Sequence, residues 1–423
     1  MVIGKGSKTE PLSTGMLSTL IQKILSKAKS FHGKKVLVII PDTTRSGPTD
    51  IVFKNIYEAL APTAKKIDFL VALGTHPVMH EDRINAFLKI SEEEKRTIYK
   101  NTDIFQHHWD NPAHLVHIGT ISAERMKTIS GGLLIEDVPI TINSKILEYD
   151  EIILVGPVFP HEVVGFSGGY KYLFPGISGP DFLNKFHWLG ALITNPKING
   201  TKDTPVREAL NEATRLLNTP ITLLCYVVKD GNVYGFYGGD IDAWSNAADL
   251  SKELNIKYVD RPYKRVLAIA PAMYEDIWTA GKCMYKLEPV VADGGTLIIY
   301  APHVKEVSYT HGENIKKVGY HTRDYFLKQM DRFKDIKGCI LAHSTHVKGI
   351  GTYVDGIEKP RVNVVLATSI PKKICKQINL GYMDCQKIDI AQYQKDKDTL
   401  VVEKAGEVLY RLQDNTIPDI DNL

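Results

Sequence analysis

The chain has 423 residues, of which 43% are hydrophobic, so it is long enough to bury two separate cores. Its 52 basic and 49 acidic residues leave a net charge of +3. This balance excludes the basic surplus that binds polyanions, and nucleic acid is not an expected partner. The first residues lack an apolar signal core, and no apolar run approaches the ~20 residues that span a bilayer.

The cysteines indicate the compartment. They are odd in number, widely scattered and without a CxxC pair: Cys225, Cys283, Cys339, Cys375 and Cys385. This pattern argues against a disulfide framework or a zinc ribbon. We therefore expect a cytoplasmic protein with no membrane partner.

Apolar runs and amphipathic segments alternate through the first 260 residues. The predicted buried strands are 34–40, 68–73, 151–155 and 221–228. The predicted helices are 16–31, 51–66 and 206–218. Alternation of this kind indicates a parallel sheet with crossover helices.

The pattern restarts after DRPYK, residues 260–264. Strands are predicted at 265–271, 295–302, 338–344 and 361–368, and a helix is predicted over 274–295. We therefore expect an α/β protein with two α/β domains and largely parallel sheets. Residues 1–262 would form a catalytic, cofactor-binding domain, and residues 263–423 a domain that closes over the substrate. The last residues could pack back on the first domain.

Polar clusters follow several of the predicted strands. PDTTR (41–45) follows the first strand, GTH (74–76) the second, and GPVFPH (156–161) a later one. In the second block, PAMYED follows 265–271, and HSTH (343–346) ends another predicted strand. Ligands in open α/β sheets bind beyond the carboxyl ends of strands. The sequence therefore predicts an active-site cleft between the two domains.

The segment 161–187, HEVVGFSGGYKYLFPGISGPDFLNKFH, concentrates chemical groups. Its loop GFSGG has few side chains, so backbone N–H groups can approach an anionic ligand. Lys171 offers a charge or a nucleophilic amine, and His161 and His187 offer proton transfer or metal ligation. The combination predicts a seat for a phosphorylated, metal-bearing cofactor.

A serine hydrolase is the first alternative, because residues 165–169 match the GxSxG motif around Ser167. That motif requires a strand directly before the first glycine and a helix directly after the last. About nine residues separate the strand from Gly165, and Pro175-Gly176 falls where the helix should run. The chain also lacks GxGxxG after its first strand and a GxxxxGK[ST] loop, which disfavours ordinary dinucleotide and P-loop sites.

The other motifs also have plain structural interpretations. PDTTR could cap the following helix, and His76 could bond a carbonyl at a strand end. HHWD (107–110) is predicted to be an exposed loop. His343 and His346 lack a third ligand nearby, which disfavours a metal site there. Lys282 could extend its amine to the surface of a helix.

The chain resembles the lactate racemase family, the nickel-pincer-nucleotide-dependent 2-hydroxyacid racemases and epimerases. The resemblance runs over most of the length, through PDTTR, GTH and the helical segment with Lys282 before Gly294-Gly295. Its most specific part is H-x3-GFSGG-x-K-x3-PG, with 10 residues from His161 to Lys171 and 16 from Lys171 to His187.

The resemblance implies a cofactor, pyridinium-3-thioamide-5-thiocarboxylic acid mononucleotide carrying Ni(II). Lys171 matches the lysine that forms a thioamide bond to it, and His187 matches the histidine that binds nickel beside its sulfur and carbon donors. Asp42 matches an acid that orients a histidine or the cofactor. The remaining cofactor contacts are expected in the glycine loop, at Gly165, Ser167, Gly168 and Gly169.

The resemblance also implies the reaction. His76 and His161 match the acid and base on opposite faces of a 2-hydroxy acid. Arg45 matches the arginine that holds its carboxylate, and Lys282 matches a second cationic substrate contact, contributed by the other domain. One histidine would take the hydroxyl proton while the C2 hydride moves to the cofactor. Return of the hydride to the other face would invert C2. The expected partners are the small-molecule substrate and the proteins that make the cofactor.

Several positions depart from the lactate enzymes. Pro77 follows His76 where arginine is usual, and Trp278 and Thr279 stand where tyrosine and glutamine are expected. Segments 309–314 and 343–353 add polar groups to the second domain. These departures favour a polyhydroxy, aldonate-type acid over lactate, with malate or another short 2-hydroxy acid still open. A non-catalytic nickel-cofactor-binding protein is a further alternative, disfavoured by the presence of His76, Arg45 and Lys282 together.

Overall fold

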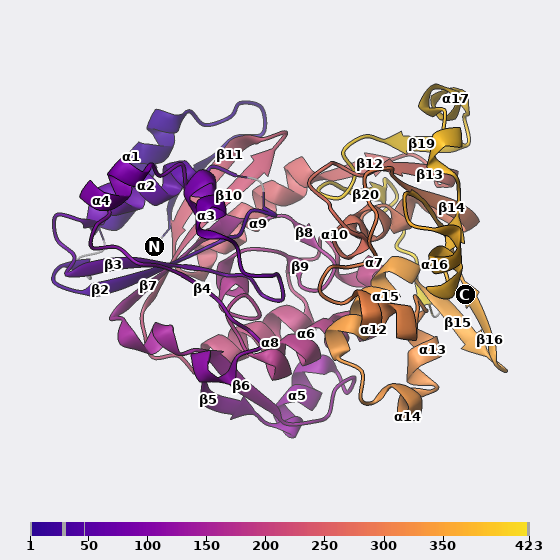
Figure 1. Cartoon of the computed structure of the whole chain (residues 1–423), viewed down its shortest axis with the longest axis horizontal. Helices are drawn as coiled ribbons and strands as arrows, with labels where there is room; N and C mark the ends of the chain where they lie inside the picture. The colour runs from indigo at the N-terminus through magenta and orange to yellow at the C-terminus, as the bar shows by residue number, and fades with distance from the viewer. Residues whose placement is uncertain (1, 28–30, 46, 421–423) are drawn as a thin grey trace. The chain divides into compact units, whose positions relative to one another are not determined.

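The computed structural model describes residues 2–27, 31–45 and 47–420. Within these residues the chain folds into two compact units, drawn in Figure 1. Unit 1 comprises residues up to Phe159, Phe166–Leu183 and Arg207–Leu254; unit 2 comprises Pro160–Gly165, Asn184–Val206 and the residues from Asn255 on. The segments 160–165 and 184–206 precede the predicted boundary at 262/263 but group with unit 2, so the chain passes between the units several times.

Unit 1 is built on a seven-stranded sheet in the order β1-β11-β10-β7-β2-β3-β4. Five neighbouring strands are parallel, and β11 and β1 pair antiparallel at one edge. The strands are β1 (Ile3–Gly6), β2 (Lys35–Ile40), β3 (Lys66–Val71), β4 (Ile104–Gln106), β7 (Glu151–Pro157), β10 (Ile221–Lys229) and β11 (Asn232–Gly239). The predicted α/β class with largely parallel pairing is thus confirmed.

The helices of unit 1 follow the sequence pattern with shifted ends. They are α1 (Thr14–Lys27), α2 (Thr49–Leu60), α3 (Glu81–Leu88), α4 (Glu92–Thr97) and α5 (Ala123–Ser130), with α8 (Pro205–Thr214) and α9 (Ile241–Asn255) after the glycine loop. The predicted helix 51–66 is too long, because α2 ends at Leu60 and residue 66 already opens β3. Pro62 explains the early end, because it has no backbone N–H with which to continue the helical hydrogen bonds past Ala61. An antiparallel pair of strands, β5 (Leu115–Ile121) and β6 (Val138–Asn143), connected through α5, completes the unit.

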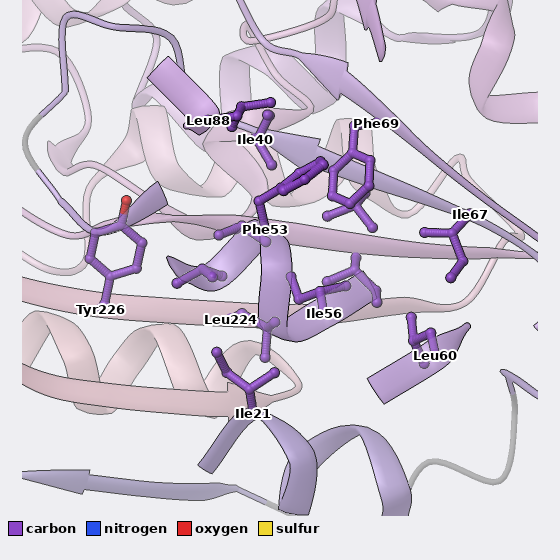
Figure 2. Packing of buried hydrophobic residues seen from close by; sticks show 14 of the residues in the cluster. Ile21, Ile40, Phe53, Ile56, Leu60, Ile67, Phe69, Leu88, Leu224 and Tyr226 are labelled. Atoms are coloured by element: carbon purple, nitrogen blue, oxygen red, sulfur yellow. The ribbon is translucent and has the colours of Figure 1, made fainter. Parts of the chain in front are cut away.

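The core of unit 1 fills one face of this sheet. Alternate strand residues such as Val36, Val38 and Ile40 point toward α1, α2 and α3, as the period of two requires. Figure 2 shows Phe53 of α2 over the strands, where its ring lies 4.3 Å from that of Phe69. The residues between them in sequence, such as Leu37 and Ile39, are buried on the opposite face. A parallel sheet covered on both faces explains the near-continuous apolar runs of these strands.

Unit 2 has an all-parallel five-stranded sheet in the order β18-β17-β14-β13-β19. Its strands are β13 (Tyr263–Ile269), β14 (Val291–Ala301), β17 (Asn363–Thr368), β18 (Gly381–Tyr382) and β19 (Thr399–Val402). Small sheets pair β12 (Ile256–Val259) with β20 (Leu409–Leu412) and β15 (Gly351–Val354) with β16 (Ile357–Pro360). Leu267, Ile298 and Ala367 form one buried cluster on this sheet.

Two predicted elements of unit 2 are wrong. The helix predicted over 274–295 is two short helices, α10 (Ile277–Ala280) and α11 (Lys282–Tyr285), and its apolar end is the start of β14. The strand predicted at 338–344 lies within a helix, α15 (Gly338–Lys348). Every residue of α15 from Cys339 to Val347 is buried. Because it has no polar face, its sequence carries no helical period that could separate it from a buried strand.

The remaining helices of unit 2 are short. They are α7 (Asn195–Ile198), α12 (Gly312–Val318), α13 (Arg323–Leu327), α14 (Met330–Phe333), α16 (Lys372–Gln377) and α17 (Ile390–Lys395). The longer α6 (Pro180–Ile193) carries His187. In the described ranges of the chain, no helix is both long and apolar enough to cross a membrane.

Candidate functional site

The predicted site residues of unit 1 follow its central strands. β2 lies between β7 and β3, and the chain winds toward β4 on one side and toward β10 on the other. The loop after β2 carries Asp42 and Arg45, the loop after β3 carries His76, and the loop after β7 leads to Lys171. The reversal of strand order beside β2 is the place where open α/β sheets bind ligands. The sheet topology therefore gathers the loops that carry Asp42, Arg45 and His76 at the carboxyl ends of the central strands.

Asp42 and His76 are joined by a hydrogen bond between these loops. His76 Nδ1 bonds directly to Asp42 Oδ2. The backbone N–H and the hydroxyl of Thr44 donate to Asp42 Oδ1 at 3.1 and 2.7 Å. His76 thus bonds a carboxylate, where the plain structural interpretation expected a backbone carbonyl.

Electrostatics keep Asp42 ionised although its side chain is only 6% exposed. Burial by itself raises the pKa of this carboxyl, but His76, Arg45 and the Thr44 hydroxyl together lower it, and the net shift is downward. An ionised Asp42 can only accept a hydrogen bond. It therefore holds the Nδ1 proton of His76 and leaves Nε2 to exchange protons with another molecule.

The glycine loop is held by its own hydrogen bonds. Ser167 Oγ accepts from Phe159 N at 2.9 Å and donates to Pro157 O at 3.1 Å, and Trp244 Nε1 donates to Ser167 O at 2.9 Å. The guanidinium of Arg207 stacks on the Trp244 ring at 4.0 Å and donates to Phe166 O. Trp244 and Arg207 lie far from the loop in sequence, and no motif around them marked this contact.

Packing accounts for the glycines. A Cβ on Gly168 would lie 2.7 Å from Val158 Cγ2, and the residue has φ +79°. A Cβ on Gly165 would lie 1.8 Å from the Thr201 carbonyl oxygen. Each position thus requires glycine because protein atoms occupy the space. The predicted cofactor contacts at Gly165, Ser167, Gly168 and Gly169 remain a prediction.

Lys171 lies on a 3-10 turn, Gly169–Tyr172, and is partly exposed. Its carbonyl accepts from Gly176 N at 3.1 Å, and the carbonyl of Gly176 accepts from Gly74 N at 2.9 Å. Gly74 is two residues before His76. The backbone of Gly176 therefore links the loop that carries Lys171 to the turn that carries His76.

Unit 2 contributes His161 and His187. His161 is buried, and its Nδ1 accepts from Val163 N at 3.1 Å, with Glu162 Oε2 at 3.4 Å. Because a backbone N–H can only donate, Nδ1 bears the lone pair, and the proton of the neutral ring is on Nε2. His187 is partly exposed, which suits a ligand to an added metal.

A group of aromatic and histidine rings surrounds α15 in unit 2. The Trp278 ring lies 4.4 Å from His311 and 4.2 Å from His343, and the Tyr320 hydroxyl lies 3.3 Å from His343 Nε2. Burial lowers the pKa of His343 well below its usual range, and the neighbouring His346, His311 and His187 lower it further. Burial also lowers the pKa of His346 to about 4, although Glu162 raises it. Both rings are therefore neutral at neutral pH.

Lys282 begins α11, and its amine lies 4.7 Å from the centre of the Tyr274 ring. The preceding turn is fixed by Asp276, whose Oδ1 accepts from the backbone N–H and hydroxyl of Thr279 at 3.0 and 2.9 Å. Thr279 is one of the positions that depart from the lactate enzymes. Within the described parts of the chain, no three His, Cys, Asp or Glu side chains are grouped to hold a metal ion.

The prediction of an exposed loop for HHWD holds for Asp110 but is wrong for His107, which is buried. His107 is 1% exposed, and its Nε2 lies 3.0 Å from Ser178 O while Asn143 Nδ2 lies 3.2 Å from its Nδ1. Burial lowers the pKa of His107 to about 4. Only the tertiary structure brings its partners, 36 and 71 residues away in sequence, into contact.

Residues 14–199 match the family described as the lactate racemase N-terminal domain. The lactate racemase of Lactiplantibacillus plantarum is 29% identical over 279 residues, which are 64% of this chain and 61% of that protein. The lactate racemase of Thermoanaerobacterium thermosaccharolyticum is 26% identical over 284 residues, 64% of this chain and 60% of that protein. The chain thus aligns with about three fifths of the length of these curated relatives.

Two solved structures are similar over nearly the whole chain. A protein from Thermotoga maritima is 34% identical with a TM-score of 0.88, over 97% of this chain and 100% of that one. The lactate racemase apoprotein of Thermoanaerobacterium thermosaccharolyticum is 20% identical with a TM-score of 0.67, over 92% of this chain and 93% of that one. The second likeness is one of fold.

Proposed function

Because the chain belongs to the lactate racemase family, we propose that it is a racemase or epimerase that inverts C2 of a 2-hydroxy acid. The observation that carries this proposal is that Nδ1 of both His76 and His161 is taken up by a hydrogen bond within the protein. Asp42 Oδ2 is bonded to Nδ1 of His76 and Val163 N donates to Nδ1 of His161, so we assign proton transfer to Nε2 of each ring. Inversion needs a base on one face of C2 and an acid on the other, and the two exchange roles in the reverse direction.

Two cations are proposed to hold the substrate. Arg45 lies in the turn that also contains Asp42, and its planar fork matches the two oxygens of a carboxylate. Lys282 is the proposed second cationic contact to the substrate. Together they would orient C2 and its hydroxyl toward the histidines, which accounts for the need for both groups.

We propose the nickel-pincer nucleotide as the cofactor. Lys171 and His187 are both partly exposed, so an amine and an imidazole are accessible for a covalent bond and for nickel, respectively. Imidazole together with soft sulfur donors suits Ni(II). When bound, the cofactor supplies a hydride acceptor and donor for C2. Asp42 and the loop Gly165–Gly169 are the other proposed contacts, and the cofactor-biosynthesis proteins are the proposed partners.

The rings around α15 support a polyhydroxy, aldonate-type substrate. A neutral histidine presents one donor and one acceptor, as a hydroxyl does, whereas a charged ring presents donors alone. His346 Nε2 is buried and has no hydrogen-bond partner among the described residues. A site built to pair with hydroxyls rejects analogues that lack them by several orders of magnitude. Lactate and malate are therefore expected to be poorer substrates.

The test uses protein produced together with the cofactor-biosynthesis proteins. Intact mass and nickel content report loading, and chiral analysis reports inversion of lactate, malate and a panel of aldonates. In D2O, return of the substrate's own hydride leaves C2 free of deuterium, whereas abstraction of a C2 proton incorporates it. Rapid inversion of lactate with no change in any aldonate would overturn the substrate class. Absence of both added mass and nickel would contradict the proposal that this protein binds the nickel-pincer nucleotide.

Variants of the two histidines distinguish an enzyme from a protein that only binds the cofactor. His76→Asn and His161→Asn are expected to lower kcat by about 10²- to 10⁴-fold while the added mass remains. His117→Asn is the matched control, because His117 is exposed on β5 and its ring lies 3.3 Å from the Thr120 hydroxyl. A non-catalytic cofactor-binding protein would load fully and show no inversion even as wild type.

Ser167→Ala tests the hydrolase alternative. Among the described residues the Ser167 hydroxyl bonds only backbone atoms, and no histidine of these residues bonds it as an activating base would. We expect racemase activity per loaded protein to stay within about threefold, with a stability loss of about 1–3 kcal/mol because the buried N–H of Phe159 loses its acceptor. Esterase activity that disappears in Ser167→Ala but survives in His161→Asn would favour the hydrolase.

A further inference from the structure

Two adjacent residues at the carboxyl end of β4, Gln106 and His107, contact the two loops that carry His76 and Lys171. We propose that they are positioning residues: Gln106 sets the turn that carries His76, and His107 sets the segment that carries Lys171. The proposal rests on the proposed function for the roles of His76 and Lys171. It rests on hydrogen bonds within unit 1 for the geometry.

The side chain of Gln106 forms hydrogen bonds with both the backbone N–H and the backbone carbonyl of Met79, which lies in the turn that carries His76. Its Oε1 accepts from Met79 N at 2.7 Å, and its Nε2 donates to Met79 O at 2.8 Å. Met79 is three residues after His76 and is buried. The turn is also fixed internally, because His76 N donates to Leu73 O at 2.9 Å. Gln106 therefore holds the far end of a turn whose near end continues from β3.

The His107 ring is neutral, and each of its two nitrogens has a hydrogen-bond partner. Asn143 Oδ1 accepts from Lys145 N at 3.1 Å, which directs its Nδ2 donor toward His107 Nδ1. The ring proton must then be on Nε2, where it is donated to Ser178 O at 3.0 Å. Backbone bonds secure the same place, since Asn143 N donates to Ile177 O at 2.9 Å and His107 N to Val71 O at 3.2 Å.

Successive turns connect Ser178 back to Lys171. Ile177 N donates to Leu173 O at 3.0 Å, and Gly176 N donates to Lys171 O at 3.1 Å. The Gly74–Gly176 bond of 2.9 Å then links this segment to the histidine turn. Gln106 thus fixes the turn that carries His76, and His107 fixes the segment that carries Lys171. The Gly74–Gly176 hydrogen bond joins the turn to the segment.

This arrangement predicts separable effects. Gln106→Leu removes both bonds to Met79 and keeps the size of the side chain, so the His76 turn can shift while the Lys171 segment keeps its anchor. We expect kcat per loaded protein to fall by about 10- to 100-fold, with loading unchanged, because small displacements of a reacting group are costly. His107→Leu leaves Ser178 O without its donor, so the loaded fraction should fall several-fold.

The experiment compares wild type, Gln106→Leu, His107→Leu, His107→Gln and the control His108→Leu. His108 is next in sequence and partly exposed, with its ring 4.9 Å from that of His114. The measurements are intact mass and nickel for loading, kcat and KM with the best substrate, and hydrogen exchange of residues 73–79 and 171–179. A glutamine at 107 can donate to Ser178 O and accept from Asn143, so His107→Gln should restore loading.

The outcomes separate the two proposals. Faster exchange in 73–79 for Gln106→Leu, and in 171–179 for His107→Leu, with the matching losses of kcat and of loading, supports positioning. Equal exchange, loading and kcat in both variants and in His108→Leu overturns it. If His107→Leu does not fold, Gln106→Leu and His107→Gln decide the question in the same way. A wild type that neither loads nor inverts any 2-hydroxy acid overturns the proposed function instead.

Discussion

Asp42 shows how one buried charge can determine the chemistry of a neighbouring side chain. Its carboxylate stays ionised because His76, Arg45 and Thr44 outweigh the effect of burial on its pKa. An ionised acceptor at Nδ1 fixes both the ring orientation and the tautomer of His76. An amide at this position would accept or donate, so it could stabilise either tautomer.

Asp42→Asn should therefore lower kcat by about 10²- to 10⁴-fold, because it permits the wrong tautomer of His76. Cofactor loading should change little if Asp42 acts mainly through His76. Steady-state kinetics and intact mass of the loaded variant measure the two effects. Asp110→Asn, at an exposed aspartate, is the control. An unchanged kcat in Asp42→Asn would contradict the assignment of proton transfer to Nε2 of His76.

The glycine loop is the element in which packing and function are hardest to separate. Gly168 and Gly231 share φ +79°, but a Cβ meets Val158 Cγ2 at 2.7 Å and Pro157 O at 3.0 Å in the first case and nothing within 4 Å in the second. The two positions share a positive φ and differ in the space available, and Gly168, with ψ −179°, lies in a region that glycine alone occupies readily.

Gly231→Ala should lower the free energy of unfolding by about 1–2 kcal/mol, because the positive φ is then its only cost. Gly168→Ala should cost about 1–3 kcal/mol more, because the added methyl group collides with packed atoms. Urea denaturation of the protein without cofactor measures both. Equal costs would mean that the loop relaxes readily, and the need for glycine at 168 would then come from the ligand.

How far the sequence predicts these elements depends on local pattern. The strands beneath the site are predictable because apolar runs such as 35–40 and 151–155 are flanked by turn residues. α15 is not, because burial on all sides removes its helical period. In the site, the PDTTR and GTH motifs mark Asp42 and His76, but their contact depends on β2 and β3 being neighbours. The buried state of His107 depends on Asn143 and Ser178, and no local pattern encodes those contacts.

At the scale of the whole molecule, both units bury neutral histidines. His107 in unit 1 and His346 in unit 2 each have a pKa lowered to about 4, mainly by burial. In the unfolded chain a histidine titrates near 6.5. Acid should therefore destabilise the two units in the same pH window, although they have separate cores.

The sign follows from proton uptake. Above pH 6.5 both rings are neutral in the folded and unfolded chain, and their contribution to stability is complete. Between pH 6.5 and about 4 the unfolded chain binds protons that the folded chain does not, so stability falls as pH falls. At pH 5 each ring accounts for a loss of about 2 kcal/mol. Asp42 contributes outside this window, because its pKa is lowered and its stabilisation is lost only below its unfolded value of 3.8.

Urea denaturation at pH 7.5 and pH 5.0 tests this expectation. Wild type should be less stable at pH 5.0, and His107→Gln and His346→Gln should each shrink the difference between the two pH values by about 2 kcal/mol. His117→Gln, at an exposed ring, should leave the difference unchanged. Because each variant removes a titrating group from a single unit, the smaller pH effect should appear only in the unfolding of that unit, which hydrogen exchange can follow separately. An undiminished pH effect in both variants would mean that other groups cause the acid sensitivity.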